Sequence, residues 1–153
     1  LEEKGISGYV INVGGNVRTI GMGKDNEPWK VGIENPNTQM QEEKPHIEYL
    51  EMSDLSLVTS GCYQRFYEVG GKSYHHIIDP ETLYPGERYL SVSVLTTDSG
   101  LGDALSTSLF LMDIDEGEKL VDSLENVEVM WVMPDGEQIY SNGFKAYTFE
   151  YKQ

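Results

Sequence analysis

The stretch Ser7–Met22 (SGYVINVGGNVRTIGM) has the pattern of two β-strands joined by a tight turn. Ser7–Val13 is rich in residues that favour strands, Gly14–Gly15 can form the turn, and Asn16–Met22 can return as the hairpin partner. Short runs of the same kind continue along most of the chain. They predict further strands at Trp29–Glu34, His46–Met52, Ser56–Ser60, Tyr63–Val69, Lys72–Ile78, Tyr89–Thr97 and Val127–Met133, with a second two-residue turn at Gly70–Gly71.

Two helices are predicted late in the chain, at about Leu101–Met112 and Glu118–Leu124. After the strand that follows them, Pro134–Gly136 is a turn signal, and the tail Ala146–Tyr151 is expected to close the sheet. Strands follow one another without a helix between each pair. The sequence therefore predicts an α+β fold with a mostly antiparallel sheet, and no βαβ repeat.

Composition narrows the classes of function. The chain has 153 residues, 39% hydrophobic and 24% charged, which is typical of one soluble globular domain. A single cysteine, Cys62, excludes an internal disulfide. The net charge of −15, from 26 acidic and 11 basic residues, disfavours nucleic-acid binding. An anionic nucleotide would need a divalent cation beside so acidic a protein, although solvated acidic faces account for most of these charges.

The first residues, Leu1–Gly5, have the form of a last helical turn stopped by a glycine cap. We therefore expect that a preceding part of the domain is not included in this sequence. The alternative is a frayed start.

The first candidate site is Gly100–Thr107 (GLGDALST). On a helix, Asp103 and Thr107 are four residues apart and lie on one face. The apolar residues are expected to form the roughly opposite, buried stripe: Leu101, Leu105, Leu109 and Met112. Carboxylate and hydroxyl oxygens at this spacing suit Mg²⁺. The alternative is that Asp103 interacts only with the helix dipole and that Thr107 is an ordinary surface residue.

The second candidate is Tyr74–Pro80 (YHHIIDP), which holds two of the three histidines. Strand side chains alternate between faces, so His76, and not His75, shares a face with Ile78. His76 is therefore a candidate acid, base or hydrogen-bonding group. The alternative is a strand end capped by the Asp-Pro turn, with one histidine half buried.

The third candidate combines Asn12–Asn16 and Thr59–Gly61. Glycines allow a ligand to approach the backbone, and exposed amides and hydroxyls can hold phosphate oxygens. Neither run matches a Walker loop or a dinucleotide-binding fingerprint, so both could equally be plain turns.

Six motifs taken in order resemble the ApbE family of flavin transferases. They are Gly8–Asn16, Trp29–Ile33, Val58–Tyr63, Tyr74–Pro80, Leu90–Val94 and Asp103–Thr107. The resemblance runs from about Gly5 to the C-terminal strand, and six motifs in one order are far more specific than any one of them. It implies that residues 1–153 are the C-terminal portion of a single α+β, ApbE-like domain whose N-terminal half is not included. That half would supply a third metal contact and an aromatic side chain that stacks on the flavin.

The resemblance also implies an activity. Members of the family use Mg²⁺ to transfer the FMN moiety of FAD to a threonine of an acceptor protein, releasing AMP, and some chiefly hydrolyse FAD to FMN and AMP. The acceptor is expected to be a flavoprotein subunit of a redox complex. The expected location is the extracytoplasmic face of the cell envelope, with a lipid anchor. Two alternatives remain: a flavin-binding or FAD-hydrolysing relative without a protein acceptor, and an acidic interaction module without chemistry.

The family's functional positions map onto this chain by motif. The implied metal ligands are Asp103 and Thr107, and the implied catalytic groups are Asp103 and His76. The implied FAD contacts are His76, the backbone of Ile77 and Ile78, and turn residues near the same cleft: Gly14, Gly15, Thr59 and Ser60. One departure is Leu83, which stands where glycine is common, so the turn after Pro80 is expected to be reshaped.

Overall fold

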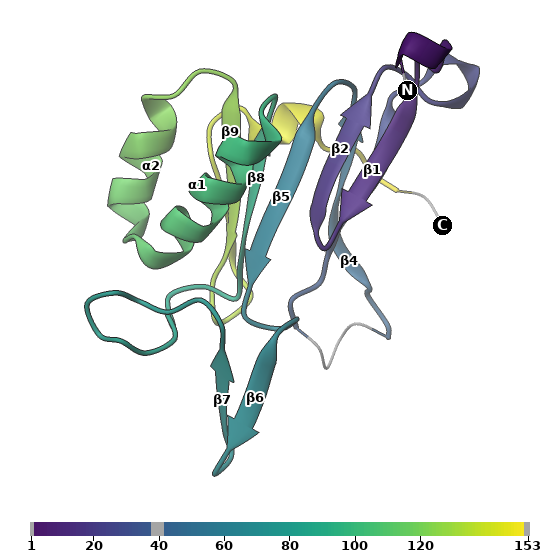
Figure 1. The fold of residues 1–153 in the computed structure, drawn as a ribbon. Helices are drawn as coiled ribbons and strands as arrows, with labels where there is room; N and C mark the ends of the chain where they lie inside the picture. Colours follow the sequence, from purple (N-terminus) through teal and green to yellow (C-terminus); the bar gives the residue numbers. More distant parts are fainter. Residues whose placement is uncertain (1, 38–41, 152–153) are drawn as a thin grey trace.

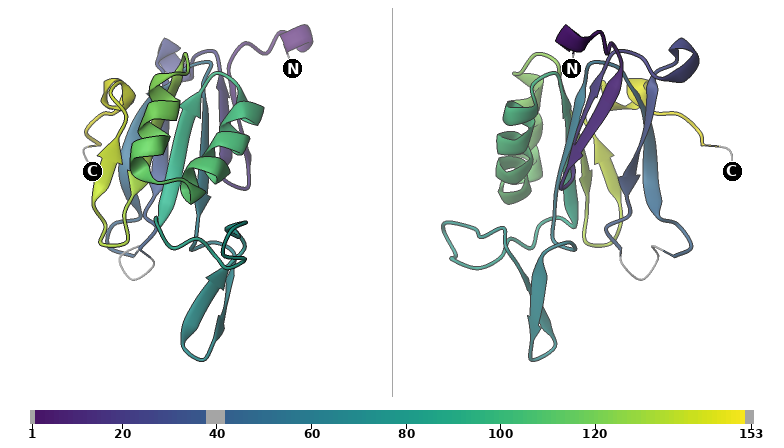
Figure 2. Two further views of the ribbon diagram at one scale, coloured as in Figure 1. Left: turned by 90° about the vertical axis from the view of Figure 1, so that its left-hand side faces the viewer. Right: turned by 45° about the vertical axis from the view of Figure 1, so that its right-hand side comes forward.

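The computed structural model describes residues 2–37 and 42–151 as three stacked layers. The middle layer is a six-stranded sheet of described residues in the order β1-β2-β5-β8-β9-β10. Helices α1 and α2 cover one face of this sheet, and the hairpin β3–β4 covers the other (Figure 2). The bounds in the six-stranded sheet are β1 Tyr9–Val13, β2 Asn16–Ile20, β5 Ser56–Gly61, β8 Ser91–Thr96, β9 Val127–Val132 and β10 Gln138–Tyr140. The other elements are β3 Trp29–Glu34, β4 His46–Met52, β6 Phe66–Val69, β7 Lys72–His75, α1 Ser99–Leu111 and α2 Ile114–Asp122.

Neighbouring strands of the large sheet are antiparallel throughout, which confirms the predicted α+β class. The first hairpin also forms as predicted. Gly14 and Gly15 adopt φ angles of 58° and 94°, which are the left-handed values that a two-residue hairpin turn requires. This turn brings the end of β1 beside the start of β2, next to β5.

Two hydrophobic cores lie on either side of the sheet. Val92, Val94 and Trp131 pack with Leu105 and Leu109 between the sheet and the helices. On the other face, a second set packs beneath β3–β4, including Leu57, Leu95, Met130, Leu50 and Ile33. All six residues of β8 are buried because both faces of this strand are covered.

Strands β6 and β7 form a separate hairpin that projects below the sheet in Figure 1. The predicted strand Lys72–Ile78 ends earlier, at His75, because the chain turns there into a loop that returns at Gly86. The second glycine turn is confirmed, with φ angles of 60° at Gly70 and 79° at Gly71.

The predicted role of the C-terminal tail is wrong. After the turn at Pro134–Gly136 the chain immediately forms β10, which pairs with β9 and fills the edge of the sheet. The tail instead forms a 3-10 turn at Phe144–Tyr147 and contacts the other layer, where Thr148 pairs with Leu50 of β4.

The predicted apolar stripe of the first helix is partly wrong. Leu105 and Leu109 are buried, but Leu101 is 41% exposed, and the neighbouring Gly102 takes its place against the sheet. A β-carbon on Gly102 would lie 2.9 Å from Val58 Cγ2 and 3.1 Å from Thr96 Cγ2. The helix backbone therefore approaches the sheet more closely than a leucine would permit. The second helix begins at Ile114, four residues before its predicted start.

Glu2–Lys4 forms a 3-10 turn, and Gly5 follows with a φ of 76°, as predicted for a glycine cap. Leu1 lies outside the described residues. Among the described residues, none of the helices combines the length and the apolar character needed to cross a bilayer.

We predict that Gly102→Ala lowers the free energy of unfolding by about 1–3 kcal/mol, because the new methyl group overpacks the contact between α1 and the sheet. Gly100→Ala is the matched control, since its methyl group would meet only the Asp98 carboxylate, at 3.4 Å. Alanine favours helices, so the control should be neutral or slightly stabilised. Urea unfolding of both variants measures the difference, and equal stabilities would contradict the close approach.

Candidate functional site

Helix α1 begins with an N-cap that leaves Asp103 free. The side chain of Asp98 accepts hydrogen bonds from the backbone N–H groups of Gly100 at 2.8 Å and Leu101 at 3.0 Å. Asp103 lies in the second turn, so the first-turn dipole role considered for it does not apply. Within the described part of the chain, the Asp103 carboxylate has no hydrogen-bonding or ionic partner, so its oxygens are available to a ligand.

Asp103 and Thr107 are both exposed on α1, and a serine from the sheet joins them. Ser60, near the end of β5, has its Oγ 3.3 Å from Thr107 Oγ1 and 2.9 Å from Ser106 Oγ. The result is a cluster of oxygen-bearing groups between one helix face and one strand end. Ser106 itself is fully buried, and nothing in the local sequence singles it out from other serines.

Thr59 and Ser60 lie within strand β5 and not in a turn, and their side chains face opposite layers. Thr59 Oγ1 is 2.8 Å from Ser93 Oγ, on the side of β3–β4, where Thr59 lines a separate cavity of about 460 Å³. Only Ser60 reaches Thr107. The side chains of the two residues therefore cannot share one cleft.

The glycine turn lies next to the start of α1 and the end of β5. Asn16 Oδ1 accepts a 2.8 Å hydrogen bond from Ser99 Oγ at the beginning of α1. Gly15 O accepts from the backbone N–H of Thr59 at 3.4 Å. The turn is thus joined to the start of α1 through Asn16 and to β5 through Gly15, and Gly15 lines the 460 Å³ cavity together with Thr59.

The two adjacent histidines have different surroundings. His75 is 8% exposed, and its Nε2 lies 2.8 Å from the carbonyl oxygen of Gly86. Because a carbonyl oxygen only accepts, Nε2 donates this bond, and Nδ1 accepts from the backbone N–H of Ile77 at 3.3 Å. The ring also packs edge-on against Phe110, with centroids 5.6 Å apart. His75 therefore anchors the loop to the helix-side core.

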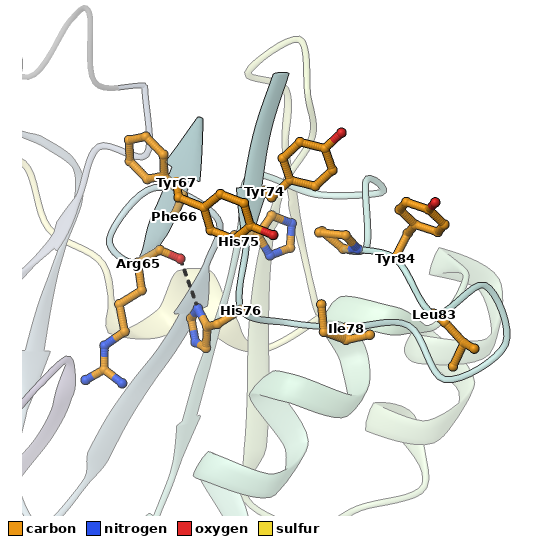
Figure 3. Close-up of a pocket in the computed structure, with 10 residues that line it drawn as sticks. Arg65, Phe66, Tyr67, Tyr74, His75, His76, Ile78, Leu83 and Tyr84 are labelled. Carbon is orange, nitrogen blue, oxygen red and sulfur yellow. Dashed lines mark hydrogen bonds between the residues drawn. The ribbon is translucent and has the colours of Figure 1, made fainter. Parts of the chain in front are cut away.

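His76 is exposed, and its Nδ1 lies 3.4 Å from the backbone carbonyl oxygen of Arg65 (Figure 3). This bond requires a proton on Nδ1, so in the neutral ring Nε2 is the acceptor. Ile77 is buried and Ile78 is 47% exposed, so the predicted alternation of His76 and Ile78 against His75 is confirmed. This alternation of side chains continues beyond the end of β7 at His75.

An open cavity of about 520 Å³ lies between the β6–β7 hairpin and the loop that follows it. Tyr67 and Tyr74 stack at its hairpin wall, with centroids 5.5 Å apart and planes 15° apart. The lining residues are Arg65, Phe66, Tyr67, Tyr74, His75, His76, Ile78, Leu83, Tyr84 and Pro85. None of the sequence motifs above includes these aromatic residues of the hairpin apart from Tyr74, although the pairing of aromatics across Gly70–Gly71 could have indicated them.

The two isoleucines differ in their relation to this cavity. Ile78 lines it, whereas the side chain of Ile77 packs in the helix-side core. The backbone groups of Ile77 are also engaged within the loop, because its carbonyl accepts from the N–H of Gly86 at 3.1 Å and its N–H binds His75.

The turn after Pro80 keeps a tight form despite Leu83. Leu83 adopts a φ of 60°, the left-handed conformation that glycine accommodates without strain, and its N–H donates to Asp79 O at 2.8 Å. The backbone N–H of Glu81, at 2.8 Å, lowers the pKa of the Asp79 carboxyl, as does the weaker bond from Thr82. Leu83 therefore carries strain in a turn whose hydrogen bonds remain intact.

Taken together, the fold and the site define an α+β domain with a glycine turn, an exposed histidine and a helix whose carboxylate has no partner among the described residues and lies one turn from a hydroxyl group. A model of the ApbE family matches residues 1–131. The chain belongs to the ApbE family.

Curated relatives and solved structures are similar over nearly the whole of this chain. The FAD:protein FMN transferase of Vibrio cholerae is 33% identical over 148 residues, which is 96% of this chain and 42% of the relative. A Klebsiella pneumoniae protein of the same description is 34% identical and covers 93% of this chain and 42% of its own length. The chain therefore spans about two fifths of the length of these relatives.

The crystal structure of an ApbE protein from Thermotoga maritima superposes with a TM-score of 0.81 at 32% identity, covering 94% of this chain and 45% of that one. The flavin transferase ApbE from Vibrio cholerae superposes with a TM-score of 0.75 at 30% identity, over 96% of this chain and 46% of the other. These similarities confirm the ApbE-like fold.

We predict that His75→Ala lowers the free energy of unfolding by about 1.5–3 kcal/mol, because it removes two buried hydrogen bonds and the contact with Phe110. His76→Ala, at an exposed position, should change it by less than about 0.5 kcal/mol. Urea unfolding followed by circular dichroism compares the two variants. A similar loss of stability in both would show that His75 does not anchor the loop.

Proposed function

We propose that this protein catalyses the Mg²⁺-dependent transfer of FMN from FAD to a threonine of an acceptor protein, with release of AMP. Membership of the ApbE family and the names of the relatives support flavin transfer. The observation that carries the proposal within the chain is the Asp103 carboxylate, which has no partner among the described residues and lies one helical turn before Thr107, whose hydroxyl is 3.3 Å from Ser60 Oγ.

The residues present fit Mg²⁺. This ion prefers oxygen ligands and commonly takes one or two carboxylates while substrate phosphates and water complete its shell. Asp103 offers one carboxylate and Thr107 one hydroxyl, and Ser60 stands within hydrogen-bonding distance of that hydroxyl. Among the described residues there is no cluster of three or more histidine, cysteine, aspartate or glutamate side chains, so the set is a sparse one. When bound, Mg²⁺ would neutralise the charge of the FAD diphosphate.

The chain's own groups supply positioning and proton transfer. The Gly14–Gly15 turn has no side chains to obstruct a phosphate that approaches its backbone. His76 carries a proton on Nδ1, bound to the Arg65 carbonyl, and its Nε2 can accept a proton. The acceptor threonine oxygen forms a bond to the phosphorus of the FMN half, and the bond from that phosphorus to the AMP oxygen breaks. The threonine proton passes to His76 Nε2. Asp103 is then a metal ligand and not the base.

On the resemblance to its family, we further propose that the acceptor is a flavoprotein subunit of a redox complex at the extracytoplasmic face of the cell envelope. In-gel flavin fluorescence identifies a covalently modified acceptor. Free FMN without labelled protein would instead support FAD hydrolysis.

We predict that Asp103→Asn in the full-length protein lowers Mg²⁺-dependent transfer at least 100-fold and leaves stability unchanged, because a neutral amide is a poor ligand for Mg²⁺. Asp115→Asn, which removes the same charge from an exposed position on α2, is the control and should stay within about twofold. Transfer is measured as acceptor-bound flavin over a Mg²⁺ titration. Turnover of the Asp103 variant within a fewfold of wild type at equal Mg²⁺ would exclude the assignment.

We also predict that His76→Gln retains FAD affinity within about fivefold but transfers FMN at least 100-fold more slowly. Glutamine keeps a polar side chain at this position but cannot act as a base, and positioned general bases contribute about 10²–10⁴-fold. Single-turnover labelling of the acceptor with saturating FAD separates the chemical step from binding. An unchanged rate would assign the base to another group.

A further inference from the structure

The three arginines of this chain differ in what their guanidinium groups contact. Arg18 Nη1 donates to the carbonyl oxygen of Thr97 at 2.8 Å and contacts Ser56 Oγ at 3.3 Å. Arg88 is paired with Asp113 at 2.8 Å and with Asp79 at 3.5 Å. The guanidinium of Arg65 has no hydrogen-bonding or ionic partner in residues 2–37 and 42–151. Arg65 is thus the arginine that is free to bind a ligand.

Arg65 lies at the base of the β6–β7 hairpin and connects two parts of the candidate site. Its backbone carbonyl accepts the hydrogen bond from His76 Nδ1. Its side chain extends the other way, toward the glycine turn: Nη2 would be 3.9 Å from a β-carbon built on Gly14. Figure 3 shows the guanidinium pointing away from the aromatic rings of the cavity. The guanidinium therefore lies beside the glycine turn, while Arg65 also belongs to the lining of the cavity that holds the tyrosines.

The charge of the protein makes this arrangement informative. With 26 acidic residues in the chain, a guanidinium has many possible carboxylate partners, and Arg88 has two of them. Arg65 instead lies at a turn of two glycines whose backbone can be approached closely. The planar fork of a guanidinium matches two phosphate oxygens, and such charge-assisted bonds are stronger than neutral ones.

The same turn is joined to the start of α1 and to strand β5. Asn16, the residue after the two glycines, is bound to Ser99 of α1, and Gly15 is bound to Thr59, next to Ser60. A phosphate beside the glycines would therefore lie near the guanidinium and near the start of the helix that carries Asp103.

We infer that Arg65 binds a phosphate oxygen of the flavin nucleotide at the Gly14–Gly15 turn, while its backbone carbonyl orients His76. This inference rests on the proposed function, because it takes FAD as the ligand. It adds a nucleotide-binding residue that none of the sequence motifs indicated. The side chain and the main chain of one residue then link substrate binding to the orientation of the base.

The test is the binding of two flavins to the full-length Arg65→Gln variant with Mg²⁺ present. FAD carries the diphosphate, and riboflavin has the same ring without phosphate. We expect the affinity for FAD to fall about 10- to 100-fold and that for riboflavin to stay within about twofold. Flavin fluorescence measures both affinities. Lys72→Gln is the matched control, since it removes one positive charge from the same hairpin, where Lys72 is paired with Glu87 at 2.9 Å.

Three outcomes would overturn the inference: unchanged FAD affinity in Arg65→Gln, an equal loss for riboflavin, or an equal loss in Lys72→Gln. The first would show that the guanidinium binds no phosphate. The other two would show a general effect on the pocket or on net charge. A wild-type protein that binds FAD but labels no acceptor would instead count against the proposed function alone, because the test measures binding and not transfer.

Discussion

The antiparallel pairing of β5 with β8 determines where the rest of the structure lies. These two strands pair from Ser56 opposite Thr96 to Gly61 opposite Ser91, and both of their faces are covered. Alternate side chains therefore enter different cores, and a slip of one residue would exchange the two sets. This constraint sends Ser60 toward α1 and Thr59 toward β3–β4. The same pairing places Val58 and Thr96 on the sheet surface that Gly102 of α1 contacts.

The candidate site combines rigid and looped elements, and each part is held by a different interaction. Asp103 and Thr107 lie on a capped helix packed closely on the sheet, so their spacing is set by helix geometry. His76 lies on a loop, and a loop residue needs additional contacts to hold its side chain in one orientation. The buried His75 ties that loop to Gly86 and Phe110, and the Arg65 carbonyl holds the His76 ring. Two neighbouring histidines thus have separate tasks, one in structure and one at the surface.

The chain has far fewer basic than acidic residues, and its cationic side chains occupy distinct positions. Most of the arginine and lysine groups with defined partners join separate elements, as Arg88 does between the loop and α2 and Lys145 does with Glu48 of β4 at 2.7 Å. A nucleotide diphosphate brought to such a protein meets strong repulsion unless cations offset it. A metal held by Asp103 and a guanidinium at the glycine turn would offset that repulsion from two sides. On the proposed function, these two cations would make an acidic surface compatible with an anionic substrate.

The sequence by itself determined the features that depend on neighbours along the chain. These are the two glycine turns, most strands, the shared face of Asp103 and Thr107, and the opposite faces of His75 and His76, because turn chemistry and side-chain periodicity are local. The tertiary structure alone decided which distant segments meet. It brought Ser60 to Thr107, placed β10 at the sheet edge that the tail was expected to fill, and exposed Leu101 in favour of Gly102. It also placed the Arg65 guanidinium beside Gly14, without a partner among the described residues. Such contacts depend on how the layers pack and on which segment pairs with the edge strand of the sheet. No local sequence pattern encodes them.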